Sequence, residues 1–211
     1  MLLQPGIWRH SSREPSTATT SHGLLVQEQQ RLVLVDTPVS AAATAELLAW
    51  TERELQQSVS RVVLTHADPN GVAGAQLLAE KRIPLVALAA TAAHYSTLGG
   101  PRATSIGDVA PGGSVRVGLV ELYYPGLEHR RDAAVVWLRE AKLLYGGRAI
   151  KSLGSSSIET LSLHERQVWS AAVRRLMQRF AEASVVVPIE GEPGGADLLH
   201  HTLRLLAAAS P

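Results

Sequence analysis

Short, uninterrupted runs of apolar residues recur along this chain, and they limit its fold more than any other feature of the sequence. Residues 33–35 form such a run, and similar runs lie in RVVLTH at residues 61–66 and in SVVVP at residues 184–188. Runs of this length fit strands that are buried on both faces. The segment GLLVQEQQRLVLVDTP predicts two such strands around a polar turn at residues 27–30.

Helical patterns lie between these runs. Residues 40–57 carry Ala, Leu and Trp at helical spacing, and Ser40 is placed to cap that helix. Further helices are predicted at residues 74–82, 91–100, 165–180 and 196–209, and a strand at residues 85–88. Two hairpins are predicted, with turns at Gly118 and near Glu140. Each half thus has strands followed by helices, which predicts an α/β chain with two sheets face to face and helices outside.

Composition narrows the classes of protein further. The 211 residues, 45% of them hydrophobic, suit one domain with a sizeable core, and no linker divides them, so we expect a single domain over residues 1–211. The balance of 20 Lys and Arg against 19 Asp and Glu, without a basic cluster, argues against a nucleic-acid partner. No stretch reaches the ~18 apolar residues of a membrane helix. The absence of cysteine excludes disulfides, thiolate nucleophiles and zinc sites with a cysteine ligand.

Polar residues collect where the predicted strands end. They lie in THADPN at residues 65–70, PGLEH at 125–129, GGR at 146–148 and IEG at 189–191. Loops beyond strand ends are where ligands usually bind, so two histidines, two acids, an amide and an arginine could converge on one site. The alternative is that each is an ordinary loop residue that caps a helix or pairs with a neighbour.

The same segments carry a family resemblance. GIW near the start, LVLVDTP, RVVLTH followed by GVAG, GGSVRVGLVELYYPG, LLYGG and the VVP…PGG segment resemble the metallo-β-lactamases, in particular the Verona-type subclass whose second zinc site uses a cysteine. The similarity runs almost without gaps over residues 32–203. It implies the four-layer αβ/βα sandwich of that family, with two mixed sheets. It also implies the bacterial periplasm, although the N-terminal MLLQPGIWRHSS lacks the pattern of a secretory leader.

The resemblance locates the family's zinc ligands on this chain, where most are replaced. The family's His-x-His-x-Asp pattern falls on His66, Asp68 and Asn70, and its third histidine falls on His129. Its cysteine and its last histidine fall on Arg148 and Glu190, so the second zinc site would consist of Asn70, Arg148 and Glu190.

These replacements change the expected chemistry. A neutral amide is a poor zinc ligand and a guanidinium cannot become one, so the second site is expected to be lost. We expect Arg148 and Glu190 to form an ion pair in its place. Asn70 cannot act as a general base at neutral pH, so efficient β-lactam hydrolysis by the family's mechanism is not expected.

The first zinc site leaves two interpretations open. His66, Asp68 and His129 form a two-histidine, one-carboxylate set that could hold a single zinc ion at low occupancy. Alternatively, no metal binds, Asp68 caps a helix starting near Asn70 or Gly71, and His66 forms hydrogen bonds nearby. The resemblance also gives Asp36 a supporting, hydrogen-bonding role.

The substrate side of the family's site is partly retained. Lys151 matches the lysine that grips the antibiotic's carboxylate, and Thr160 stands where an asparagine often does. With Arg148, these residues suggest a small anionic or β-lactam-like ligand. The other histidines match no ligand of the family. Three functions therefore remain: a noncatalytic ligand-binding member, a hydrolase with one metal, or an interaction protein.

Overall fold

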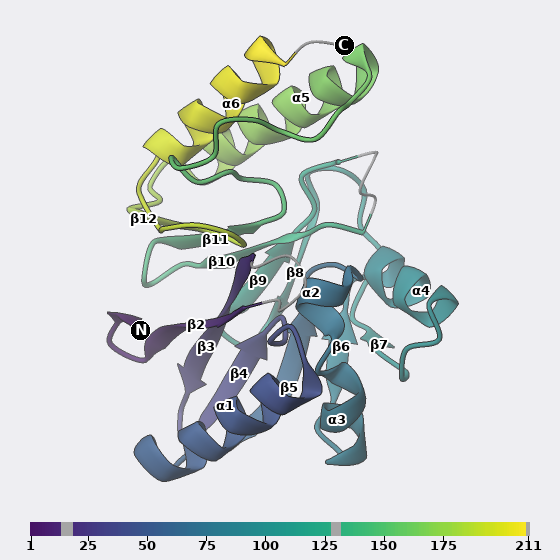
Figure 1. The fold of residues 1–211 in the computed structure, drawn as a ribbon, viewed down its shortest axis with the longest axis vertical. Coiled ribbons are helices and arrows are strands. Elements are labelled where there is room, and N and C mark those ends of the chain that lie inside the picture. Colours follow the sequence, from purple (N-terminus) through teal and green to yellow (C-terminus); the bar gives the residue numbers. More distant parts are fainter. Residues whose placement is uncertain (14–18, 128–131, 210–211) are drawn as a thin grey trace. The chain divides into compact units, whose positions relative to one another are not determined.

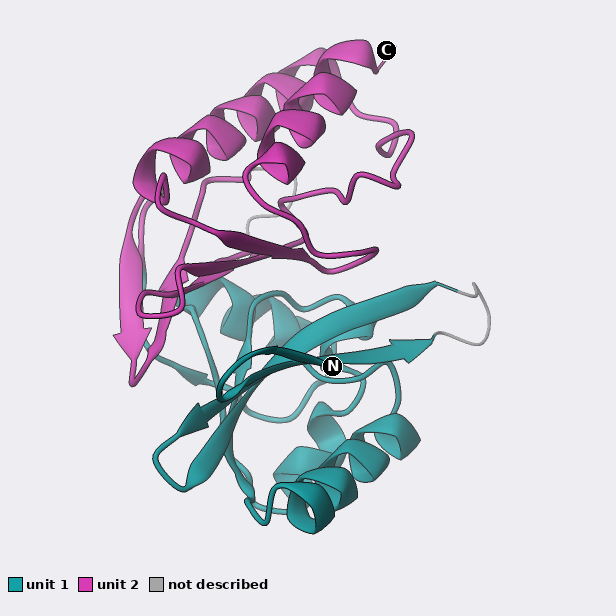
Figure 2. Ribbon diagram, turned by 90° about the vertical axis from the view of Figure 1, so that its left-hand side faces the viewer, with its two compact units in different colours: residues 1–108 teal, residues 109–211 magenta. Residues whose placement is uncertain are grey.

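The computed structural model describes residues 1–13, 19–127 and 132–209. The chain divides into two compact units, Met1–Asp108 and Val109–Pro211 (Figure 2). Each unit contains one sheet and its own helices (Figure 1). The single domain expected over residues 1–211 stays a prediction. No helix in the described ranges is long and apolar enough to cross a membrane.

The first unit is built on a seven-stranded mixed sheet whose strands follow the order of the sequence. Its first four strands pair antiparallel and the remaining ones are added in parallel. The strands are β1 (Leu2–Gln4), β2 (Ile7–Arg13), β3 (Thr20–Glu28), β4 (Arg31–Val35), β5 (Val59–Leu64), β6 (Leu85–Ala87) and β7 (Thr104–Ser105).

Helices connect the parallel strands of this sheet, as parallel connections require. They are α1 (Ala41–Glu54), the single turn α2 (Pro69–Val72), α3 (Ala75–Glu80) and α4 (Ala89–Thr97). The apolar face formed by Leu34, Val62 and Leu64 packs against Leu48 of α1 and Leu78 of α3 in one buried core. The side chain of Ser40 accepts a hydrogen bond from the amide of Ala43, which confirms the predicted cap of α1.

The second unit is built on a five-stranded mixed sheet with the order β12-β11-β10-β9-β8. Only β11 and β12 pair in parallel. The strands are β8 (Ser114–Val117), β9 (Val120–Tyr123), β10 (Val135–Leu138), β11 (Leu143–Gly147) and β12 (Val185–Pro188). Gly118 has a φ of 62°, a left-handed conformation that suits the tight turn predicted between β8 and β9.

Two long helices, α5 (Leu163–Arg179) and α6 (Asp197–Ala208), complete the second unit. Trp169 and Leu176 of α5 pack with Leu198 of α6 and with Trp137 and Leu144 of the sheet. Ser162 and Glu165 form a reciprocal capping box at the start of α5. Two mixed sheets with helices confirm the predicted fold class.

Candidate functional site in the loop after β5

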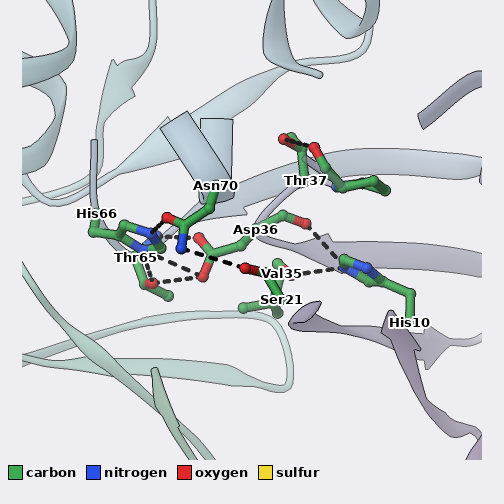
Figure 3. Close-up of polar contacts among 9 residues, drawn as sticks. His10, Ser21, Val35, Asp36, Thr37, Thr65, His66 and Asn70 are labelled. Atoms are coloured by element: carbon green, nitrogen blue, oxygen red, sulfur yellow. Dashed lines mark hydrogen bonds and ion pairs between the residues drawn. The ribbon is translucent and has the colours of Figure 1, made fainter. Parts of the chain in front are cut away.

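A polar cluster lies in the first unit where β4 and β5 end. We call Ser21, Asp36, Thr65, His66 and Asn70 the His66 cluster (Figure 3). Asp36 follows β4, and Thr65 and His66 follow its parallel neighbour β5, so the two strand ends meet at the same edge of the sheet. The convergence predicted for residues 65–70, 125–129, 146–148 and 189–191 stays a prediction.

Asp36 supports the loop after β5. Its carboxylate accepts hydrogen bonds from the amide of Thr65 at 2.8 Å and from the Thr65 hydroxyl at 2.6 Å (Figure 3). The carboxylate is 1% exposed, so these bonds replace the water it has lost. The backbone of Asp36 has a φ of 53°, a left-handed conformation that aspartate tolerates better than most residues. The hydrogen-bonding role expected for Asp36 is therefore confirmed.

Both ring nitrogens of His66 have partners within the protein. Nδ1 lies 3.0 Å from the Thr65 hydroxyl and 3.6 Å from the carboxylate of Asp36. Nε2 lies 3.3 Å from Oδ1 of Asn70 (Figure 3). A Cβ atom on Gly71 would come within 2.6 Å of Nε2, so only glycine lets α2 approach the ring this closely. His66 is thus held between Thr65 and the first turn of α2.

Asn70 links the loop after β5 to a second strand. Its Nδ2 donates to the Ser21 hydroxyl of β3 at 3.3 Å, while its Oδ1 faces His66. A side-chain amide can both donate and accept, so Asn70 can donate to Ser21 and also face His66 as an acceptor. A carboxylate at this position could only accept from both neighbours. Asn70 therefore acts here as a hydrogen-bonding bridge between β3 and His66.

Asp68 occupies the N-cap position of α2, as predicted, but its side chain makes no capping hydrogen bond. The expectation that its carboxylate caps this helix is therefore wrong. The helix is a single turn of four residues, with Pro69 at its start. The amide of Gly71 instead donates to the backbone carbonyl of Asp68 at 2.9 Å.

The predicted single-metal set cannot be assembled from the described residues. His129 lies outside them, so the set of His66, Asp68 and His129 stays a prediction. Within residues 1–13, 19–127 and 132–209, no group of three His, Cys, Asp or Glu side chains is placed to hold a metal ion. His66 and Asp68, the two members described, do not make a zinc site on their own.

The other altered ligand positions lie at strand ends of the second unit. Arg148 follows β11 and Glu190 follows β12, two parallel neighbours whose ends are joined by a hydrogen bond from Ile189 to Gly147 at 3.1 Å. The ion pair expected between Arg148 and Glu190 is nevertheless wrong, since none joins them in the described part of the chain. Gly147 has a left-handed φ of 48°, so the strand register does not continue into Arg148.

Lys151 is already engaged by neighbouring groups. Its ammonium lies 3.4 Å from the carboxylate of Glu159 and 5.8 Å from the centre of the Trp169 ring. Its backbone amide donates to Thr202 of α6. Thr160 is exposed and lines a cavity of about 230 Å³ beside the end of α6. A role of Lys151, Arg148 or Thr160 in ligand binding stays a prediction.

His10 is a buried polar residue to which the sequence assigned no chemistry. Its Nε2 lies 3.2 Å from the carbonyl oxygen of Asp36 and 3.4 Å from that of Val35 (Figure 3). Burial is the main cause that lowers the pKa of His10 from 6.5 to about 4. No apolar alternation in the sequence marks this role; in the structure, β2 places Trp8, His10 and Ser12 on one face.

Comparison with known proteins agrees with this architecture. The Metallo-beta-lactamase superfamily profile matches residues 17–190. This chain belongs to that superfamily. A type 2 metallo-beta-lactamase of Bacillus cereus is 31% identical over 208 residues, covering 97% of this chain and 80% of the relative. The predicted family membership is therefore confirmed.

Solved metallo-beta-lactamase structures share the fold. The metallo-beta-lactamase from Pontibacter korlensis has a TM-score of 0.87 and 31% identity, with 99% of this chain and 98% of that one covered. The metallo-beta-lactamase FIM-1 from Pseudomonas aeruginosa, in a mono-zinc form, has a TM-score of 0.87 and 27% identity, with 98% and 93% covered.

Proposed function

We propose that this chain is a metallo-β-lactamase-like protein with a degenerate zinc centre, which lacks efficient β-lactam hydrolysis and at most binds a small anionic ligand. In this proposal it derives from the subclass with a cysteine in the second zinc site, and Arg148 stands in the place of that cysteine. The observation that carries the proposal is the contact between Nε2 of His66 and Oδ1 of Asn70.

This contact opposes metal binding by His66. The amide oxygen of Asn70 can only accept a hydrogen bond, and so can the Thr65 hydroxyl, which donates its own hydrogen to Asp36. The single ring hydrogen of a neutral His66 therefore serves Asn70 through Nε2 or Thr65 through Nδ1, and in this proposal it lies on Nε2. A ring nitrogen that carries a hydrogen has no lone pair for a metal ion. The other nitrogen, Nδ1, faces Thr65 and Asp36. Binding of zinc at His66 would therefore require the cluster to give up at least one of these contacts.

Hydrolysis is disfavoured for a second reason. Asn70 stands where the family has an aspartate, and a neutral amide does not take up a proton near neutral pH. Asp36 is not a substitute, because its carboxylate is buried and already accepts two hydrogen bonds from Thr65. In this proposal the residues of the cluster hold the loop after β5 in place, and none of them activates a water molecule.

Ligand binding is the activity that these residues could still support. Arg148 offers a guanidinium, which suits carboxylate groups because of its planar set of donors. Lys151 could contribute only by leaving Glu159, its present partner. A small anion is therefore the ligand class that fits this part of the proposal.

A hydrolase with one zinc ion is the second candidate. It is favoured by the mono-zinc form of the relative FIM-1, which indicates that one metal can be accommodated in a protein of this fold. In this chain the ion would be held by His66, Asp68 and His129. Such a site would require His66 to exchange Asn70 for the metal, and its carboxylate ligand would be Asp68.

One experiment separates these candidates. The protein is dialysed against excess zinc, freed of unbound metal and assayed for zinc content and for turnover of a chromogenic cephalosporin. The proposal expects far less than one zinc per chain and no turnover above the buffer rate. Stoichiometric zinc and turnover that are both lost in His129→Ala would replace it by the one-zinc hydrolase.

A restoration variant examines the cause of the loss. It combines Asp68→His, Asn70→Asp, Arg148→Cys and Glu190→His, which reinstates the family's ligands. If these four side chains are what removed the metal, the variant binds zinc tightly while the parent does not. A variant that folds but still binds no zinc would place the cause outside these four positions and contradict the proposal as stated.

A further inference from the structure

The only asparagine of this chain is followed by glycine. Asn70 is the single asparagine among the 211 residues, and Gly71 comes next in the turn α2. An asparagine before a glycine is the pair most open to deamidation, because glycine has no side chain to hinder attack by its backbone nitrogen on the neighbouring amide. The sequence therefore carries one candidate site for this modification, inside the His66 cluster.

Deamidation needs only these two residues and water. The backbone nitrogen of Gly71 attacks Cγ of Asn70, the bond from Cγ to Nδ2 breaks, and ammonia leaves with the hydrogen that the backbone nitrogen gives up. Water then opens the resulting succinimide ring at either of its carbonyl carbons. The product is an aspartate or an isoaspartate at position 70, and the net change is one amide exchanged for one carboxylate.

The packing of His66 explains why glycine stands after Asn70. A Cβ atom on Gly71 would lie 2.4 Å from Cε1 and 2.6 Å from Nε2 of the His66 ring, and both residues are buried. A larger residue at position 71 would slow deamidation but would push against this ring. The reactive pair is thus kept for a packing reason, and protection of Asn70 has to come from the conformation of the loop.

The backbone of the folded loop opposes the reaction. Asn70 belongs to the helical turn Pro69–Val72, and its backbone must leave the helical conformation before the Gly71 nitrogen can approach Cγ. The same nitrogen donates a hydrogen bond to the carbonyl oxygen of Asp68 at 2.9 Å. Attack on Cγ therefore requires this hydrogen bond to break and the turn to open.

The side chain of Asn70 is restrained as well. Its Nδ2 donates to the Ser21 hydroxyl at 3.3 Å, and its Oδ1 lies 3.3 Å from Nε2 of His66 (Figure 3). Ser21 is 3% exposed and His66 is 1% exposed, so neither partner can follow the amide when it moves. Rotation of the amide toward the backbone of Gly71 would break both contacts.

We propose that Asn70 is a deamidation site that the folded protein suppresses, and that the reaction proceeds when α2 opens locally. A single turn of four residues is the kind of element that opens without global unfolding. The product carboxylate cannot donate to Ser21, so the bridge between β3 and the loop after β5 is lost. The proposal does not rest on the proposed function, because neither zinc nor a ligand takes part.

The test follows deamidation in a mildly alkaline buffer with a chelator, once in the folded protein and once in guanidinium chloride. Intact mass and ion exchange count the converted chains, and a peptide digest locates the change and separates aspartate from isoaspartate. We expect the folded protein to react at least about tenfold more slowly than the unfolded chain. Equal rates would overturn protection by the fold, and no reaction in guanidinium chloride would overturn the site itself.

A variant of Ser21 examines the restraint on the side chain. Ser21→Ala removes the acceptor of the Asn70 amide, so the folded variant should deamidate about fivefold faster than the parent, with an unchanged rate in guanidinium chloride. Ser96→Ala, at an exposed serine of α4, is the matched control and should react as the parent does. A folded Ser21→Ala that reacts at the parent's rate would contradict the role of this contact.

Hydrogen exchange of the Gly71 amide gives a second measure in the parent protein. The hydrogen bond from this amide to Asp68 must break for exchange and for deamidation alike. Folding should therefore slow both reactions by the same factor, within about threefold. If Ser21→Ala does not fold, this comparison still decides. Fast exchange of Gly71 together with slow deamidation would contradict a common opening step.

Discussion

Nε2 of His66 lies 3.3 Å from Oδ1 of Asn70, so a residue at the position of a family metal ligand is held by a neutral amide. The other side of the ring is held by Thr65, which in turn binds the buried carboxylate of Asp36. These contacts place a continuous chain of polar side chains at the end of β5. Its members contribute to the stability of the loop, and this contribution can be measured.

Asp36→Asn should destabilise the protein by about 2 kcal/mol, because the carboxylate that accepts two hydrogen bonds from Thr65 is replaced by a group with one acceptor oxygen. Asparagine tolerates the left-handed backbone at this position, so the effect reports on the side chain. Urea denaturation measures the change. Glu52→Gln, on the exposed face of α1, should alter stability by less than about 0.5 kcal/mol. Equal effects of the two variants would contradict the prediction.

The buried His10 predicts a specific loss of stability in acid. The pKa of His10 is about 4 in the folded protein, against an ordinary value of 6.5. Between pH 6.5 and 4 this histidine therefore binds a proton in the unfolded chain but not in the folded protein. Stability is therefore lost as the pH falls from about 6.5 to about 4, by up to about 3 kcal/mol for this group.

His10→Gln removes the pH-dependent contribution of this histidine to stability, because glutamine can donate to the two carbonyl oxygens but does not titrate. The free energy of unfolding, measured at several pH values, should fall less steeply in this variant than in the parent between pH 6.5 and 4. His200→Gln, on the exposed side of α6, should leave the slope unchanged. Parallel curves for the parent and His10→Gln would contradict the assignment.

Two glycines separate the effect of close packing from that of backbone conformation. A Cβ atom at Gly23 would lie 2.3 Å from Nε2 of His10 and 2.4 Å from the Val35 carbonyl, so Gly23→Ala should cost about 3 kcal/mol or prevent folding. Gly99 has a φ of 75° and open space around it, so Gly99→Ala should cost only about 1 kcal/mol. Thermal or urea unfolding measures both, and the reverse order would show that the strands at Gly23 can move apart.

The capping box at α5 should be worth about 1 kcal/mol. Ser162 accepts a hydrogen bond from the amide of Glu165, and the Glu165 carboxylate accepts one from the amide of Ser162. Ser162→Ala removes the first of these. Ser157→Ala, in the exposed loop before the helix, provides the control and should change stability by less than about 0.5 kcal/mol. The prediction fails if both substitutions have the same small effect.

Most strands and helices could be predicted from the sequence because their apolar periods are clear and their ends carry recognisable residues. The strand β4, the helix α1 with its Ser40 cap and the hairpin at Gly118 are examples. The N-terminal strand β2 was harder to recognise. Its inward-facing His10 is buried through hydrogen bonds to backbone carbonyl groups, so no apolar alternation marks it.

The side-chain contacts of the site could be predicted only in part. Asp36 follows a strand end directly, so its hydrogen bonds to the next strand followed from its position. The ion pair predicted between Arg148 and Glu190 does not form, because the left-handed Gly147 precedes the arginine and breaks the strand register. Asp68 likewise reaches the N-cap of α2, but its side chain makes no capping hydrogen bond.

The left-handed backbone of Asp36 has a consequence for how freely this chain can change. Both the side chain and the backbone favour aspartate at that position. The hydrogen bonds to Thr65 require a carboxylate, and the positive φ requires a residue that tolerates a left-handed backbone. Asp68 and Asn70 have no such double requirement, because neither has a positive φ. The chemistry of the loop after β5 can therefore be exchanged while its anchor is kept. A catalytic centre could be removed from this protein, or built back into it, without rebuilding the frame that supports it.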